Sequence, residues 1–143
     1  MRILLQFPQG LKAKALEESA KYEKQGHEVF LSATACWGAC DLALDEAKKI
    51  GADRLIHYGH AQFGDKAAKS GGVEIEYKLY PITVDLGVLK DALPLLAPYP
   101  RLGLVTTVSH LHQLDDMKKI LREGDPDHPH EVLTTRGGLA ILE

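Results

Sequence analysis

The sequence has few cysteines, few aromatic residues and no long hydrophobic run. Only two of its 143 residues are cysteine, and aromatic residues make up 6%. In an intracellular protein, two cysteines favour free, metal-bound or catalytic thiols over a structural disulfide. No apolar run approaches the roughly 20 residues that a membrane-spanning helix needs, so we expect no membrane segment.

The sequence also lacks a large excess of either charge, because 26% of its residues are charged but the formal net charge is only −3. This balance gives no general electrostatic reason for direct binding of nucleic acid. The N-terminal residues 1–7 indicate a strand and are too short for a signal peptide, so we predict a cytoplasmic protein. A hydrophobic content of 45% is enough for one ordinary core and a fragment of a second.

Short apolar runs alternate with helical patterns in the first part of the chain. Apolar runs at 2–7, 27–32 and 54–58 predict strands, and the spacing of apolar residues predicts helices over 11–25 and 41–50. Strand, helix and strand in this order are typical of parallel sheets with crossover helices. The sequence therefore predicts an α/β fold, a parallel sheet flanked by helices.

The later part of the chain contains a candidate domain boundary. A strand with one solvent-facing side is expected at 73–79 and a short helix at 86–93, followed by a proline-rich connection around Pro98. We therefore predict a complete first α/β domain at 1–98 and the beginning of a second, related domain at 99–143.

The segment after Pro98 repeats features of the N-terminal segment. Arg101–Thr106 resembles Arg2–Phe7, and His130–Thr135 resembles His27–Ser32. These similarities predict an internal duplication. Two unrelated strand–helix–strand units that merely look alike fit the same pattern equally well.

The spacing within the two segments predicts where a second cysteine would fall. Cys40 lies thirteen residues after His27, and the position thirteen residues after His130 is Glu143, the last residue. If the duplication is real, we expect the second copy to be cut off where its cysteine stretch is due.

Both cysteines and the only tryptophan lie in the stretch Ala33–Asp41, between a predicted strand and a predicted helix. Asp41 is expected to cap that helix, whose dipole would then favour a thiolate at Cys40. Small residues before Cys40 would let a bulky cofactor approach. However, Cys36 and Cys40 also fit the pattern of ordinary buried cysteines, and two cysteines alone are a weak metal signal.

Two histidines, His57 and His60, flank Tyr58 and Gly59 at the end of the third predicted strand. In a parallel sheet this strand end lies at the same edge as the cysteine stretch and the turn Pro8–Gly10. His60 could transfer a proton near pH 7, whereas His57 has the pattern of a structural strand histidine. The backbone N–H groups of the turn could bind a carboxylate or phosphate.

A resemblance to a known family is carried by three blocks, Gln6–Leu11, Cys36–Asp41 and His57–His60. They resemble the 2-(3-amino-3-carboxypropyl)histidine synthases of diphthamide biosynthesis, in the archaeal form. The tract Leu104–Leu114 is similar to the start of the second domain in that family. Together the blocks span most of the chain.

The resemblance implies a [4Fe–4S] cluster that is held by one cysteine from each of three related domains and binds S-adenosylmethionine at its open iron. It implies transfer of a 3-amino-3-carboxypropyl radical to a histidine of translation elongation factor 2. Cys40 matches the ligand of the first domain, whereas Cys36 stands where the family requires no cysteine. His60 is a candidate catalytic residue. The candidate S-adenosylmethionine region comprises Gln9, Gly10, Tyr58 and Gly59.

Full-length members of this family are longer and carry two further ligand cysteines. Because one thiolate cannot hold a stable cluster, we expect this chain alone to be inactive, as a fragment or as one subunit. The parent enzyme is expected to be a homodimer, and apolar surface at Val132, Leu133 and Ile141 would need covering. Two alternatives stay open: an α/β binding or scaffold module without redox chemistry, and a partner subunit that borrows cluster ligands from another chain.

Overall fold

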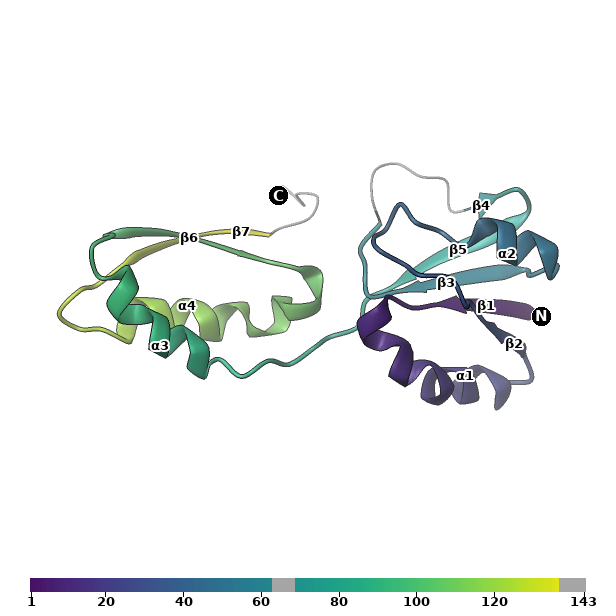
Figure 1. The fold of residues 1–143 in the computed structure, drawn as a ribbon, viewed down its shortest axis with the longest axis horizontal. Helices are drawn as coiled ribbons and strands as arrows, with labels where there is room; N and C mark the ends of the chain where they lie inside the picture. The colour runs from purple at the N-terminus through teal and green to yellow at the C-terminus, as the bar shows by residue number, and fades with distance from the viewer. Residues whose placement is uncertain (63–68, 137–143) are drawn as a thin grey trace. The chain divides into compact units, whose positions relative to one another are not determined.

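The computed structural model describes residues 1–62 and 69–136. It divides the chain into two compact units, Met1–Tyr80 and Pro81–Glu143, which are shown as a ribbon in Figure 1. Among the described residues, no helix has both the length and the apolar character needed to cross a bilayer.

The first unit is built on a five-stranded sheet with the strand order β2-β1-β3-β5-β4. Its strands are β1 (Arg2–Gln6), β2 (Glu28–Leu31), β3 (Arg54–Tyr58), β4 (Lys69–Ser70) and β5 (Val73–Lys78). All neighbouring strands run parallel except β4, which pairs antiparallel with β5. The predicted α/β fold with a parallel sheet is confirmed.

Helices connect the parallel strands of this unit. The 3-10 helix η1 (Gln9–Lys14) leads into α1 (Ala15–Glu23), and α2 (Leu44–Lys49) precedes β3. The single helix expected at 11–25 is therefore two helices in succession. The helix expected at 41–50 is shorter and begins later than predicted.

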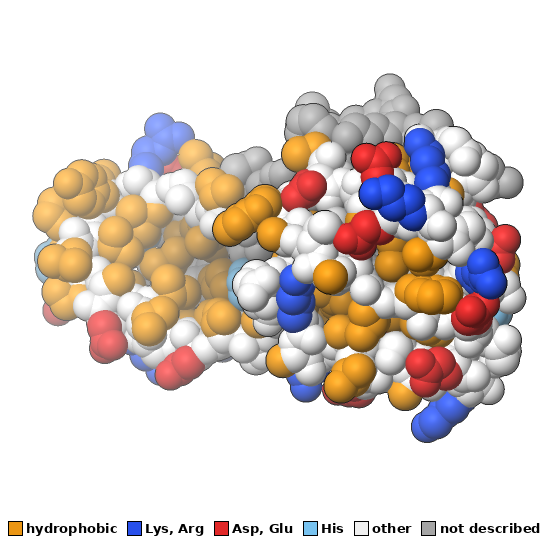
Figure 2. All heavy atoms as spheres, turned by 45° about the vertical axis from the view of Figure 1, so that its right-hand side comes forward, with side chains coloured by type: hydrophobic (Ala, Val, Ile, Leu, Met, Phe, Trp, Pro, Cys, Tyr) orange, Lys and Arg blue, Asp and Glu red, His pale blue; other side chains and the backbone are white. Residues whose placement is uncertain are grey.

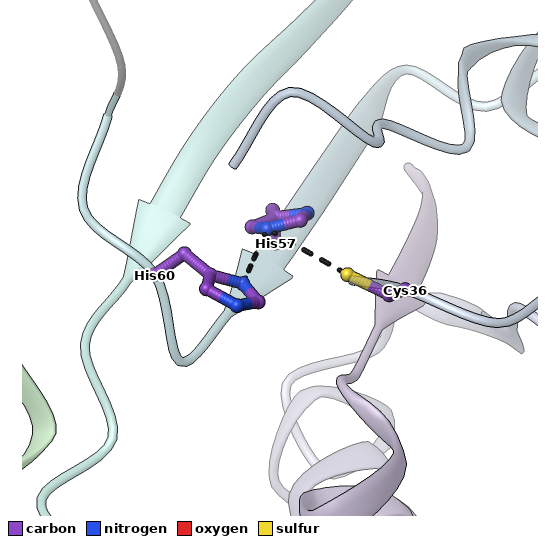
Figure 3. A group of neighbouring side chains, drawn as sticks. All are labelled: Cys36, His57 and His60. Carbon is purple, nitrogen blue, oxygen red and sulfur yellow. Dashed lines mark hydrogen bonds between the residues drawn. The ribbon is translucent and has the colours of Figure 1, made fainter. Parts of the chain in front are cut away.

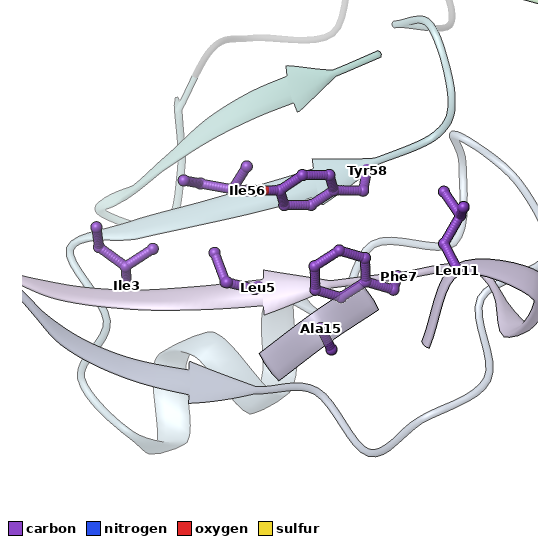
Figure 4. Packing of buried hydrophobic residues seen from close by; sticks show 7 residues of the cluster. All are labelled: Ile3, Leu5, Phe7, Leu11, Ala15, Ile56 and Tyr58. Atoms are coloured by element: carbon purple, nitrogen blue, oxygen red, sulfur yellow. The ribbon is translucent and has the colours of Figure 1, made fainter. Parts of the chain in front are cut away.

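Side chains of the central strands alternate between the two faces of the sheet, so the unit has two apolar clusters. The first contains Ile3, Leu5, Phe7, Leu11, Ala15, Ile56 and Tyr58 (Figure 4). The second, on the other face, contains Leu4, Ala43, Ala47, Ala52, Leu55 and Val73. In the first cluster the rings of Phe7 and Tyr58 stack with their centroids 4.3 Å apart.

The second unit contains a parallel pair of strands, β6 (Arg101–Thr106) and β7 (Glu131–Arg136). Between them lie the 3-10 helix η2 (Val108–Gln113) and α4 (Leu114–Glu123), and α3 (Gly87–Leu96) precedes β6. Hydrophobic side chains cover much of the visible face of this unit, at the left of Figure 2. Its exposed large hydrophobic residues include Val88, Leu95, Tyr99, Val105 and Leu133.

The boundary between the units lies before α3, whereas the sequence suggested Pro98. Leu93 of α3 is buried with Leu121 of α4 and Val132 of β7, and this packing joins the helix to the second unit. Pro94 lies inside α3, and the helix continues to Leu96 instead of ending near Pro94, although proline cannot donate the helical hydrogen bond to the carbonyl of Lys90.

The expected apolar surface at the end of the second unit is found only in part. Val132 is 4% exposed, so its expected exposure is wrong, because α3 and α4 cover it. Leu133, which points to the other face of its strand, is 50% exposed. Ile141 lies outside the described residues.

The two units share the arrangement that the duplication predicted. Each has a strand, a 3-10 helix, an α-helix and a second strand parallel to the first. The registers correspond, since Arg2 lies opposite Glu28 and Arg101 lies opposite Glu131. Each of these pairs forms an ion pair, at 2.8 Å and 3.0 Å respectively.

Candidate functional site at the carboxyl ends of the strands

The turn after β1 and the residue after β3 lie in contact at the carboxyl edge of the sheet. Gly59 has a φ of +80°, and a Cβ atom placed on it would lie 3.1 Å from side-chain carbons of Pro8 and Leu11. A glycine is therefore needed here for its backbone conformation and for the close approach. The contact brings the predicted Pro8–Gly10 turn and Gly59 together.

The segment 32–43, which we call the cysteine loop, follows β2 at the same edge. Its two thiols lie in different surroundings, because Cys36 is buried and Cys40 is exposed. The Tyr77 hydroxyl donates a hydrogen bond of 3.1 Å to the carbonyl of Ala39 and so fastens the loop beside Cys40 to β5.

The predicted helix start beside Cys40 is wrong. α2 begins at Leu44, and its N-cap position is occupied by Ala43. The Asp41 carboxylate instead accepts a hydrogen bond of 3.2 Å from the backbone N–H of Trp37 within the loop. The geometry therefore gives no helix-dipole reason for a thiolate at Cys40.

Cys36, His57 and His60 converge at the end of β3, as Figure 3 shows. The Nε2 atom of His57 lies 3.0 Å from Nδ1 of His60 and 3.9 Å from Sγ of Cys36. One potential ligand atom from each side chain lies within 4.8 Å of the other two, and no second such group occurs within residues 1–62 and 69–136. The sequence predicted the proximity of this strand end to the cysteine loop, but not the pairing of Cys36 with His57.

A buried glutamine, Gln6 of β1, sets the orientation of His57. Its Nε2 atom donates to the carbonyl of Asp41 at 2.7 Å, and its Oε1 atom accepts from the N–H of Ala43 at 3.1 Å. The amide orientation follows from these two backbone groups. Oε1 also lies 2.9 Å from His57 Nδ1, so Nδ1 must carry the proton. The Nε2 lone pair of neutral His57 therefore points toward His60 and Cys36.

Burial keeps all three side chains of this group uncharged near neutral pH. Burial, together with a smaller effect of the nearby His60, lowers the pKa of His57 to about 4. Burial also lowers the pKa of His60 and raises the pKa of the Cys36 thiol. Because His57 is neutral, its Nε2 accepts the hydrogen bond that His60 Nδ1 donates.

Tyr58, which was predicted for the S-adenosylmethionine region, has its side chain in the core. It is fully buried, its ring stacks on Phe7, and its hydroxyl donates a hydrogen bond of 2.9 Å to Glu18. Burial raises the pKa of Tyr58. The structure corrects the prediction for this side chain, since only the backbone of Tyr58 lies at the strand end.

The other predicted residues of the site remain accessible. Gln9 and Gly10 are exposed in η1, and no atom lies within 4 Å of a Cβ placed on Gly10. His60 is half-buried and follows Gly59 directly. Their assigned roles in binding and catalysis stay predictions.

Two positioning residues, Gln6 and Tyr77, were not recognised as such from the sequence. Gln6 is a polar residue within the apolar run of β1, and it is 1% exposed. A buried polar side chain must find partners, and this was the available signal. Tyr77 gave no such signal, because aromatic residues are common in strands.

The fold and site define an α/β protein that presents an exposed thiol and a histidine pair at the ligand-binding edge of a parallel sheet. The model of the diphthamide synthesis protein family matches residues 7–137. The chain belongs to this family.

Named relatives cover most of this chain. It is 33% identical, over 84% of its length, to 2-(3-amino-3-carboxypropyl)histidine synthase of Pyrococcus horikoshii. It is 30% identical, over 79% of its length, to the human 2-(3-amino-3-carboxypropyl)histidine synthase subunit 1. It spans 34% of the archaeal relative and 26% of the human one, about a third or less of their lengths.

The crystal structure of Dph2 from Pyrococcus horikoshii with a 4Fe-4S cluster is similar to this chain. The TM-score is 0.70 at 31% sequence identity, and the match covers 92% of this chain and 37% of that one. The likeness agrees with the α/β fold.

Proposed function

We propose that this chain is part of an enzyme that transfers the 3-amino-3-carboxypropyl group of S-adenosylmethionine to a histidine of translation elongation factor 2. Family membership and the similarity to a protein with a 4Fe-4S cluster support the proposal. The structural observation that carries it is the exposed thiol of Cys40 at the carboxyl edge of the sheet.

The residues fit a shared cluster but not a cluster of this chain alone. The sequence has two cysteines, and the thiol of Cys36 is buried against His57. Cys40 is the accessible one, and the two residues directly before it, Gly38 and Ala39, are small. One thiolate does not hold a cluster, so the remaining ligands must come from other polypeptide segments, and the chain alone is inactive.

When bound, the cluster supplies the electron that cleaves the sulfonium carbon–sulfur bond. The protein residues have separate tasks. Cys40 binds iron through its thiolate, and Gln6 and Tyr77 hold the loop on either side of it. The exposed backbone of Gln9 and Gly10, with Gly59 beside their turn, forms the region for the amino acid portion of S-adenosylmethionine.

His60 acts as the base in this proposal. The transfer replaces a C–H bond of the target imidazole by a C–C bond, so one proton must leave that carbon, and the electron supplied for the cleavage would return to the cluster. Because His60 donates its Nδ1 proton to His57, its Nε2 carries a lone pair that can accept this proton. The lowered pKa of His60, caused by burial, keeps it in the neutral form that can act as a base.

A chimera tests the proposed activity. It joins this chain to the remaining two thirds of the Pyrococcus horikoshii relative and is assayed with labelled S-adenosylmethionine and elongation factor 2. We expect label on one histidine of the factor. His60→Gln should lower the rate by about 10² or more with the cluster intact, whereas His110→Gln in the second unit should not. A chimera with a full cluster that transfers no label would contradict the proposal.

The human and other eukaryotic relatives are named subunit 1, which favours a second arrangement with the same chemistry. In that arrangement this chain works beside another polypeptide that supplies the missing cluster ligands. Co-purification from the native source separates the two arrangements. For the whole enzyme we propose a homodimer, located in the cytoplasm where elongation factor 2 acts.

A further inference from the structure

We propose that Cys36, His57 and His60 form a second metal site, separate from the cluster ligand Cys40, for a single divalent ion of the zinc class. The ligand set is one thiolate and two imidazoles, which suits Zn²⁺ and its spectroscopic substitute Co²⁺. Three protein ligands leave one position of a tetrahedral ion open for water or another small ligand.

Two of the three ligand separations are close to what such an ion requires, and the third, between Cys36 and His60, is at most 4.8 Å. With metal–nitrogen bonds of about 2.0 Å and a metal–sulfur bond of about 2.3 Å, tetrahedral ligand atoms lie roughly 3.3–3.6 Å apart. His57 Nε2 lies 3.0 Å from His60 and 3.9 Å from Cys36. Side-chain shifts of about 0.3 Å would correct each of these two separations.

The surroundings of His57 resemble those of a metal-bound histidine. A histidine ligand usually donates its second ring N–H to an oxygen atom, which fixes the ring and the tautomer. His57 does so to Gln6 Oε1, which is itself held by the backbone of Ala43. Its Nε2 lone pair is therefore directed at the space between the other two side chains before any metal arrives.

Cys36 lacks a strong hydrogen-bond partner, although it is only 4% exposed. Its thiol lies 3.9 Å from His57 Nε2 and 4.0 Å from the carbonyl of Gly38, both at the long limit for sulfur. The half-buried His60 gives an ion access to the group from solvent. These features distinguish the group from a fully satisfied core cluster.

Proton balance follows from the hydrogen bonds. Binding removes the thiol proton of Cys36 and moves the ring proton of His60 from Nδ1 to Nε2, while His57 keeps its proton on Nδ1. One proton is thus released for each ion bound. An ion at this site also blocks the lone pair that the proposed function assigns to His60, so metal occupancy and that base role exclude each other.

The test uses the tag-free 143-residue chain, freed of metal under reducing conditions and titrated with Co²⁺. We expect one ion per chain, a thiolate-to-cobalt charge-transfer band, visible bands of tetrahedral cobalt, and release of one proton. Cys36→Ser should remove the charge-transfer band and weaken binding at least tenfold. His60→Gln should weaken binding to a similar extent, and Cys40→Ser should change neither.

Three results would overturn the proposal: no cobalt binding by the folded chain, a charge-transfer band that survives Cys36→Ser, or a band lost only with Cys40→Ser. Circular dichroism of each variant establishes that it is folded before the titration. None of these readouts depends on an iron–sulfur cluster or on transfer to elongation factor 2. Failure of the metal site can therefore be told apart from failure of the proposed function.

Discussion

The two units of the molecule begin with the same arrangement but differ in how deeply it is buried. β1 pairs with β2 on one side and β3 on the other, and its residues Ile3–Gln6 are all buried. β6 pairs, within the described residues, with β7 alone, and its side chains alternate between exposed and half-buried. The neighbours of a strand, more than its own apolar sequence, determine its burial.

The units also differ at positions that correspond in the repeat. Where the first unit buries Gln6, the second has Val105, which is 63% exposed. Where α1 buries Glu18, α4 buries Met117. At these two positions the first unit has a buried polar side chain where the second has an apolar one, and the polar residues that the second unit buries, Ser109, Gln113 and His130, lie elsewhere.

The largest expected difference between the units lies in their cores. Leu5→Ala should lower the free energy of unfolding of the first unit by about 3 kcal/mol, because Leu5 is fully buried. The matched change Leu104→Ala, at a half-buried position, should cost about 1 kcal/mol. Amide hydrogen exchange in β1 and β6 measures each unit separately. Equal losses would show that β1 is no better supported than β6.

A second contrast concerns Gln6. Gln6→Leu leaves the Asp41 carbonyl, the Ala43 N–H and the His57 Nδ1–H without their partner, so we expect a loss of about 2 kcal/mol or more. Val105→Gln in the second unit should change stability by less than about 0.5 kcal/mol. Nitrogen chemical shifts of His57 should also report a mixed tautomer in Gln6→Leu, and an unchanged tautomer would refute the orienting role.

The buried carboxylate of Glu18 should make the first unit the more acid-sensitive one. Burial by itself raises the pKa of Glu18, but hydrogen bonds from Lys21 and Tyr58 and nearby lysine charges outweigh it and lower the pKa below its usual 4.5. A lowered folded-state pKa means that this stabilisation is present above pH 4.5 and is lost as the pH falls through the folded-state value.

Glu18→Gln should therefore cost about 1–2 kcal/mol at neutral pH and much less in acid. Unfolding of both proteins between neutral and acidic pH measures the difference between them. Met117→Leu is the matched control in the second unit, and its effect should not depend on pH. A constant cost of Glu18→Gln across the range would show that its charge contributes nothing.

The smallest effect is expected from the corresponding ion pairs. Arg2 and Arg101 are both exposed, so replacing either by glutamine should cost about 0.5 kcal/mol, and salt should reduce the effect. Arg2 should matter slightly more, because it also donates a hydrogen bond of 3.0 Å to the carbonyl of Ile50. Urea unfolding measures the loss of stability in each variant. A larger loss at Arg101 than at Arg2 would contradict the expected contribution of the hydrogen bond to Ile50.

The fold could be predicted because it follows from local periodicity. Apolar runs, helical spacing and turn residues placed the main parallel strands and brought the correct strand ends to one edge. The unit boundary could not be predicted in this way. α3 belongs to the second unit through the contact of Leu93 with α4, and a proline-rich stretch gives no information about such a contact.

The details of the site depend on contacts between residues far apart in the sequence. Gln6 binds groups 35, 37 and 51 residues away, and Cys36 meets a histidine 21 residues further on. No periodicity encodes these pairings. For Tyr58 the neighbouring sequence was misleading. Its place directly before Gly59 and His60 suggested a ligand contact, but its side chain packs in the core.

The role of Cys40 as cluster ligand is tested most directly by replacing either cysteine in the chimera. The iron content and the electron paramagnetic resonance signal of the reduced protein are then measured. We expect Cys40→Ala to lose most cluster iron and signal and Cys36→Ala to keep both, because only Cys40 presents an exposed thiol. A full cluster in Cys40→Ala, or its loss in a folded Cys36→Ala chimera, would contradict the assignment of the two thiols to separate sites.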